Sequence, residues 1–218
     1  MGFLSKIAER AAQSEGHARL AAERGLSYET IGTLPEATPL LRATGGKSFS
    51  SVMQGTLGDS IQGYAAMMTH SAPDDYAGDH DIDATFDQVV LAGAADAAAF
   101  IPTLVVGSRS GWEPLPEEQL QEISTESSEV SKRYRIWIGP ETSENRVRQL
   151  LSPVMVDWLA TVDVGGFAFE LDKGWFCAYA RPSVYIPFAK PGKPEELAWL
   201  MDTADGLVKR ILAEAAEQ

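Results

Sequence analysis

The chain has a single cysteine, Cys177, and no run of apolar residues that approaches the length of a membrane span. One cysteine excludes an internal disulfide, and its aromatic neighbours predict a buried structural thiol rather than a reactive one. A membrane helix needs about 18 consecutive apolar residues. The first 25 residues also lack the continuous apolar centre of a signal peptide. These absences predict a cytoplasmic protein without a membrane span.

Positive charge is missing from a long central stretch. No Lys or Arg occurs between Lys47 and Arg109, and the chain as a whole carries a net charge of −13. The same stretch contains Asp59, Asp74, Asp75, Asp79, Asp81, Asp83, Asp87 and Asp96. Such a surface repels phosphate backbones and anionic lipids, so it argues against nucleic acid as a partner.

Complete catalytic motifs are also missing. The segment 44–48 (TGGKS) has the glycine, lysine and hydroxyl of a phosphate-binding loop, but Leu41 stands where that loop needs its first glycine. The segment 107–111 (GSRSG) has Arg109 where a hydrolase nucleophile elbow needs serine. The sequence therefore favours a non-catalytic protein, leaves an enzyme open, and indicates no cofactor.

What the chain does contain is the alternation of strands and helices of an α+β domain. Apolar spacing of 3.6 residues predicts helices at about 143–162 and 194–216, and a kink at Pro153 within the first. Turn residues predict hairpins of 49–57 with 60–69, and of 167–171 with 175–179. Further strands are expected at 84–92, 101–107, 119–127 and 133–138.

These elements predict an antiparallel sheet with both helices packed on one face. Residues 1–25 form a helical arm whose pattern is interrupted at Gly16, and residues 26–218 form a single domain. The arm is expected to pack on the domain or on a second copy of the chain, so the expected partners are the protein itself, as a homodimer, or another protein.

Three aspartates in the acidic loop 74–87 have the spacing of a cation site. Asp79, Asp81 and Asp83 occupy positions one, three and five of a calcium loop, but Ala84 and Val90 replace the required glycine and glutamate. An EF-hand is excluded. The alternatives that remain are a weak cation site, used by a cation-dependent enzyme or sensor, and a solvated loop.

The preferred binding candidate is one face of the strand 133–138. Alternation places Arg133, Arg135 and Trp137 on one side of it, and guanidinium and indole groups suit an acidic or aromatic partner. The competing interpretation is that another helix covers this face of the sheet. Glu170 and Asp172 also form a possible carboxylate pair, but paired acids on a strand are more often surface residues.

Several framework segments carry a family resemblance. They are Ala21–Leu26, Leu34–Leu41, Glu126–Ser127 with Tyr134, Leu150–Pro153, Trp158–Leu159 and Gly166–Glu170. With these residues the chain resembles an uncharacterised, largely actinobacterial family of acidic α+β proteins. The resemblance extends over nearly the whole chain and implies the fold, but it brings no activity, cofactor or catalytic residue. The main functional hypothesis is therefore a non-catalytic binding or self-association module.

Overall fold

The computed structural model describes residues 3–42, 47–58, 61–70, 85–93, 103–109, 118–125, 127–162, 166–180 and 192–216. It confirms the α+β fold. The strands are β1 (Ser27–Gly32), β2 (Ser48–Leu57), β3 (Ile61–His70), β4 (Thr85–Gly93), β5 (Leu104–Ser108), β6 (Gln121–Ile123), β7 (Tyr134–Ile138), β8 (Phe167–Asp172) and β9 (Trp175–Ala180). The helices are α1 (Phe3–Glu23), α2 (Pro39–Arg42), α3 (Ser128–Arg133), α4 (Glu144–Leu150), α5 (Pro153–Thr161) and α6 (Pro194–Ala216).

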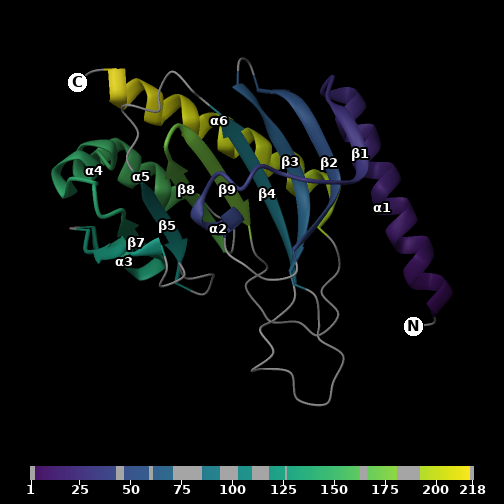
Figure 1. The fold of residues 1–218 in the computed structure, drawn as a ribbon, viewed down its shortest axis with the longest axis horizontal. Helices are drawn as coiled ribbons and strands as arrows, with labels where there is room; N and C mark the ends of the chain where they lie inside the picture. Colours follow the sequence, from purple (N-terminus) through teal and green to yellow (C-terminus); the bar gives the residue numbers. More distant parts are fainter. Residues whose placement is uncertain are drawn as a thin grey trace, which may run out of the picture.

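The strands form one sheet in the order β1-β2-β3-β4-β9-β8-β5-β7-β6. Every pair of neighbours is antiparallel. The hairpin of β8 and β9 lies at the centre, between β4 and β5, so strands from both halves of the chain pair on it (Figure 1). Strand β8 is buried along its whole length because it is central and covered on both sides.

One face of the sheet, the helix-covered face, carries the larger apolar core. Strand residues such as Met53, Val90 and Phe169 pack there against α1, α4, α5 and α6. Helix α6 contributes an apolar stripe at helical spacing, Leu197, Leu200, Met201, Ala204, Leu207, Val208 and Ile211. These residues recur every three or four positions, so the sequence pattern alone places them on one side of the helix.

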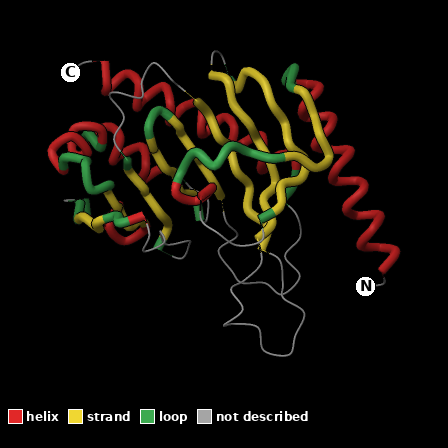
Figure 2. Tube along the Cα trace, viewed as in Figure 1, coloured by secondary structure: helices red, strands yellow, loops and turns green. Residues whose placement is uncertain are grey.

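The opposite face is covered by an extended segment, here called the strap, residues 34–42, which ends in α2. In Figure 2 the strap crosses in front of the strands and α6 runs behind them. Leu34, Leu40 and Leu41 of the strap are buried against strand residues such as Val89 and Cys177. The predicted layer of helices on one face is thus present, and a second, thinner layer covers part of the other.

The prediction of one helix kinked at Pro153 is wrong, because two separate helices, α4 and α5, occupy this segment. Helix α4 stops at Leu150, and Pro153 is the first residue of α5. Proline has no N–H to donate, and the first turn of a helix is where none is needed. The Ser152 hydroxyl caps α5 by accepting from the Met155 amide at 3.3 Å.

Other local expectations need correction. Helix α1 continues through Gly16 without interruption, and β1 and α3 were not predicted. The strand expected at 119–127 is only three residues long, because Ser127 caps α3 with its hydroxyl. Both predicted hairpins are confirmed, and Lys173 and Gly174 turn the second with φ angles of 48° and 84°. Within the described ranges, no helix is long and apolar enough to cross a membrane.

Candidate functional site

The predicted Arg133–Arg135–Trp137 face is not a single surface. Arg133 is the last residue of α3 rather than a residue of β7. Its guanidinium donates to the backbone carbonyl oxygens of Ala160, at 2.7 Å, and of Val162. It therefore stabilises the C-terminal end of α5, where unpaired carbonyl groups and the helix dipole favour a cation. The prediction that Arg133 shares a face with the other two residues is wrong.

Arg135 and Trp137 do lie on one side of β7, the side of the strap. The guanidinium carbon of Arg135 lies 5.0 Å from the centre of the Trp137 ring. Arg135 also donates to both carboxylate oxygens of Glu122 on β6, at 3.2 and 2.7 Å. Trp137 is only 7% exposed. This pair is thus engaged within its own sheet, and the binding role predicted for it stays a prediction.

The aspartates Asp79, Asp81 and Asp83 lie outside the described residues, as does most of the loop 74–87. Among the residues whose positions are described, no group of three or more His, Cys, Asp or Glu side chains is arranged to hold a metal ion. The cation hypothesis therefore stays a prediction.

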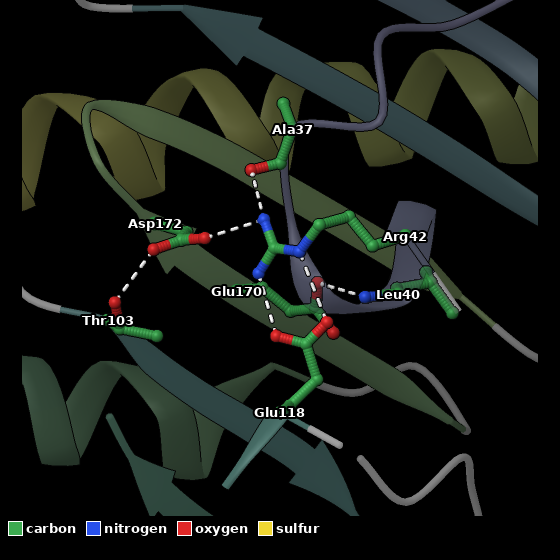
Figure 3. Close-up of polar contacts among 7 residues, drawn as sticks. All are labelled: Ala37, Leu40, Arg42, Thr103, Glu118, Glu170 and Asp172. Carbon is green, nitrogen blue, oxygen red and sulfur yellow. Dashed lines mark hydrogen bonds and ion pairs between the residues drawn. The ribbon is translucent and has the colours of Figure 1, made fainter. Parts of the chain in front are cut away.

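A polar cluster lies beneath the strap, on the central strand β8 (Figure 3). One Asp172 carboxylate oxygen accepts a hydrogen bond from the Thr103 hydroxyl at 2.7 Å. The other forms an ion pair with the Arg42 guanidinium, also at 2.7 Å. Arg42 also donates to both carboxylate oxygens of Glu118, at 3.1 and 2.8 Å, and to the Ala37 carbonyl. The guanidinium thus links strap, sheet and Glu118, and the fixed fork geometry of arginine suits such a junction.

Glu170 lies two residues before Asp172 on the same face and is completely buried. One carboxylate oxygen accepts from the Leu40 amide of the strap at 2.9 Å. Burial raises the pKa of Glu170 to about 7, and the Leu40 amide, the Thr38 hydroxyl and the charge of Arg42 oppose that shift. In the described part of the chain, the Thr38 hydroxyl and the other Glu170 oxygen form no hydrogen bond of normal geometry. Glu170 is therefore protonated in part at neutral pH.

Cys177 is the cross-strand neighbour of Glu170. It is a free, buried thiol, and burial together with the adjacent Glu170 raises its pKa well above the ordinary value. A raised pKa disfavours the thiolate that nucleophilic or metal chemistry requires. The sequence correctly predicts a structural thiol here. It singled out Glu170 and Asp172 as a pair but not their burial, because burial depends on a strap more than 120 residues away.

A second feature, an open pocket of about 400 Å³, lies on the same face of the sheet. We call it the Gly93 pocket, and it is lined by Gln54, Gln62, Gly63, Tyr64, Gly93, Lys173, Gly174 and Trp175. The register of the strands explains it. Gly93 of β4 stands between Gln62 of β3 and Trp175 of β9 in one cross-strand row. Because glycine has no side chain, the row has a gap there.

The Trp175 ring fills only one side of this gap. A Cβ atom added at Gly93 would lie 3.1 Å from the ring, so the indole rests directly against the glycine backbone. Gln54 and Tyr64 form the next row, and the Gln54 amide nitrogen lies 3.3 Å from the Tyr64 hydroxyl. Lys173 is exposed in the turn at the rim. The pocket thus combines two aromatic rings, two amides and one ammonium group.

The two features differ in access. Glu170 and Asp172 are at most 1% exposed beneath the strap. In the Gly93 pocket Tyr64 and Trp175 are partly buried, whereas Gln54, Gln62 and Lys173 are exposed. The same row of side chains that contains Tyr64 continues through Leu91 and Cys177 to Glu170. A small molecule can therefore reach the pocket, and it cannot reach the carboxylates without displacing the strap.

Comparison with known proteins adds a structural neighbour. No family model matches the chain, and no curated protein matches it in sequence. Among solved structures, the chain is similar to the crystal structure of the mycobacterial trehalose monomycolate transport factor A, TtfA, with a TM-score of 0.59. The match covers 91% of this chain and 95% of the other, at 12% sequence identity. At this identity the likeness shows a shared fold and no more.

Proposed function

We propose that this protein is a non-catalytic binding module and that the Gly93 pocket is its ligand site. The observation that carries the proposal is the gap at Gly93, which opens a pocket between amide and aromatic side chains. Ligand sites in proteins are typically concave, with apolar and aromatic walls and a few polar groups that set orientation. The pocket has this composition.

The binding role is preferred to catalysis because Tyr64 and Lys173 are the only ionisable side chains among the described residues that line the pocket. The part of the lining that the structure describes includes no histidine, cysteine or carboxylate. General acid–base chemistry most often uses a group of this kind within hydrogen-bond reach of the reacting atom. Glu170, whose pKa lies near 7, is sealed beneath the strap.

The experiment is a ligand screen read at Trp175. The chain has five tryptophans, so the indole N–H resonances can be resolved by NMR, and the Trp175→Phe variant identifies the one that belongs to the pocket. We expect members of a small-molecule fragment library to shift this resonance and to lose the effect in Gly93→Leu, whose side chain fills the gap. Gly206→Leu is the matched control, because a Cβ at Gly206 meets nothing within 4 Å.

If no fragment shifts the Trp175 resonance, or if every shift persists in Gly93→Leu, the pocket is not a ligand site. Thermal melting of both glycine variants shows whether they fold. Should Gly93→Leu fail to fold, Tyr64→Ala replaces it, since it removes one aromatic wall and leaves the Trp175 reporter in place.

A second candidate is self-association through β1. Within the described residues β1 has a sheet neighbour on one side only, and its Ile31 is 77% exposed. Its sequence contains neither the lysine nor the proline that protects many edge strands. A second copy of the chain would pair there and continue the sheet in a homodimer, with Ile31 buried at the junction.

Light scattering tests this candidate. We expect the wild-type protein to have the mass of a dimer and the Ile31→Lys variant to have that of a monomer. Val154→Lys is the matched control, since Val154 is also a large exposed apolar residue, at 63% exposure, but lies on α5. A monomeric wild-type protein, or equal effects of both substitutions, contradicts the role of β1.

A further inference from the structure

The aromatic walls of the Gly93 pocket present flat apolar surface beside water. The Trp175 indole lies against Gly93, and Tyr64 stands one row away on the neighbouring strand. Both side chains also pack against the core beneath the strap, so their rings are held in place. Rings held in this way favour a ligand with a flat apolar face, because stacking then costs little side-chain entropy.

The polar groups of the pocket select a hydroxylated ligand. Gln54 and Gln62 each carry a carbonyl oxygen that accepts and an NH₂ group that donates. The Gln62 amide already donates to the Thr56 hydroxyl at 2.7 Å, and the Gln54 amide to Tyr64 at 3.3 Å. These contacts fix the amide orientations. Hydroxyl groups both donate and accept, so they are the natural complement of such a set.

The charge of the pocket lining distinguishes between cationic, anionic and neutral ligands. Among the lining residues that the structure describes there is no carboxylate, and the one charged side chain is Lys173. A cationic ligand therefore lacks a counter-ion and faces an ammonium group. An anionic ligand such as a nucleotide or a sugar phosphate finds one lysine at the rim but enters the field of a chain with net charge −13. A neutral ligand avoids both penalties.

We infer that the Gly93 pocket binds a neutral saccharide, with one sugar ring stacked on Trp175 and its hydroxyls bonded to Gln54 and Gln62. A pyranose ring has the two required surfaces, an apolar C–H face and a rim of hydroxyls. The volume of about 400 Å³ lies at the lower end of the range of small-molecule sites, which suits one or two rings. This inference rests on the proposed function and names its ligand class.

The test is titration of the protein with a defined panel, followed at the Trp175 indole resonance. The panel contains methyl α-glucoside and maltose as neutral saccharides, glucose 6-phosphate and AMP as anions, and choline as a cation. We expect saturable shifts with the neutral sugars, and affinities for both anions and for choline at least about tenfold weaker.

Variants give a second readout. Trp175→Ala is expected to weaken sugar binding by about tenfold or more, because it removes the stacking surface. Gln62→Ala is expected to weaken it by about fivefold, the effect of one hydrogen bond. Gln121→Ala is the matched control for it, since Gln121 is also an exposed strand glutamine but lies on β6, and it should change the affinity by less than about twofold. Isothermal titration calorimetry measures all four proteins.

The outcomes distinguish the inference from the proposed function. Binding of AMP or choline in preference to the neutral sugars, with loss in Gly93→Leu, rejects the saccharide and leaves the pocket as a ligand site. Equal sugar affinities of the wild type and Gln62→Ala also reject the proposed mode of recognition. No response at Trp175 to the panel or to any fragment of the wider screen rejects both.

Discussion

The two faces of the sheet are built by different means. On the helix-covered face, long amphipathic helices bury a continuous apolar core. On the strap face, the nine residues 34–42, which include the short helix α2, cover only part of the sheet. Buried carboxylates, a free thiol and an open pocket all occur on this second face. Polar and concave features thus gather where the apolar cover is thin.

The physical reason is the geometry of the cover. A helix presents a wide apolar stripe and satisfies its own backbone hydrogen bonds, so a polar strand residue beneath it needs a helix side chain as partner, as Gln88 has in Glu196 at 3.3 Å. The strap is short and ends in α2, and the first amides of a helix have no partner within it. The Leu40 amide, in this first turn, donates to Glu170. Beyond the strap no element of the described chain fills the gap at Gly93, which leaves the pocket open.

The largest predicted effect compares core residues on the two faces. Phe169→Ala, on the helix-covered face, should lower the free energy of unfolding by about 3–5 kcal/mol, because rigid helices cannot close the cavity. Leu40→Ala, in the strap, should cost about 2–3 kcal/mol, since a short segment can settle into the space. Urea unfolding followed by circular dichroism measures both. Equal losses would mean that the strap is as rigid as the helices.

A second prediction concerns Glu170. Its folded-state pKa of about 7 lies above the ordinary value of 4.5, so the folded state binds more protons and stability falls as the pH rises from 4.5 to 7. Glu170→Gln removes this loss and should raise stability at pH 8 by roughly 2–4 kcal/mol relative to its effect at pH 4.5. Urea unfolding across this range checks it. A pH-independent difference between the two proteins would show that Glu170 is not the titrating group.

The smallest effect is expected at His17, a buried polar residue of the helix-covered face, 1% exposed. Burial lowers its pKa below 6.5, and Glu195 of α6 partly opposes this shift. The unfolded state then binds more protons, so stability is complete above pH 6.5 and falls as the pH decreases. His17→Phe should remove this loss, which unfolding at pH 5 and pH 7 measures. Glu195→Gln should deepen the loss, and no change in either variant would contradict it.

The two titrations have opposite signs, which sharpens the contrast between the faces. Acid weakens the packing of α1 on α6 through His17, whereas base weakens the strap through Glu170. A variant with both substitutions should therefore show a flatter dependence of stability on pH than either single variant.

Much of the fold was predictable because local patterns determine it. The hairpin turn at Lys173–Gly174 and the apolar stripe of α6 were correctly inferred from spacing and turn chemistry. Helix α3 was missed because its six residues are too few to show a period. Strand β1 was missed because it is polar and exposed and owes its conformation to pairing with β2.

The candidate site was largely beyond prediction from the sequence. Arg133 and Arg135 alternate as strand residues should, yet one of them ends a helix and stabilises the end of another. None of the residues that line the Gly93 pocket was predicted from the sequence to be a binding residue. Its members come from β2, β3, β4, β9 and the β8–β9 turn, and a glycine among apolar strand residues carries no sign of what stands beside it.

The sequence by itself determined the fold class, the central hairpin, the helical faces, the absence of a long apolar helix from the described chain and the acidic charge. Each of these depends on residues within a few positions of one another. Tertiary structure alone decided that Glu170 and Asp172 are sealed beneath the strap and that Gly93 faces Trp175. Those outcomes depend on strand register and on contacts between segments up to 130 residues apart, which local patterns do not encode.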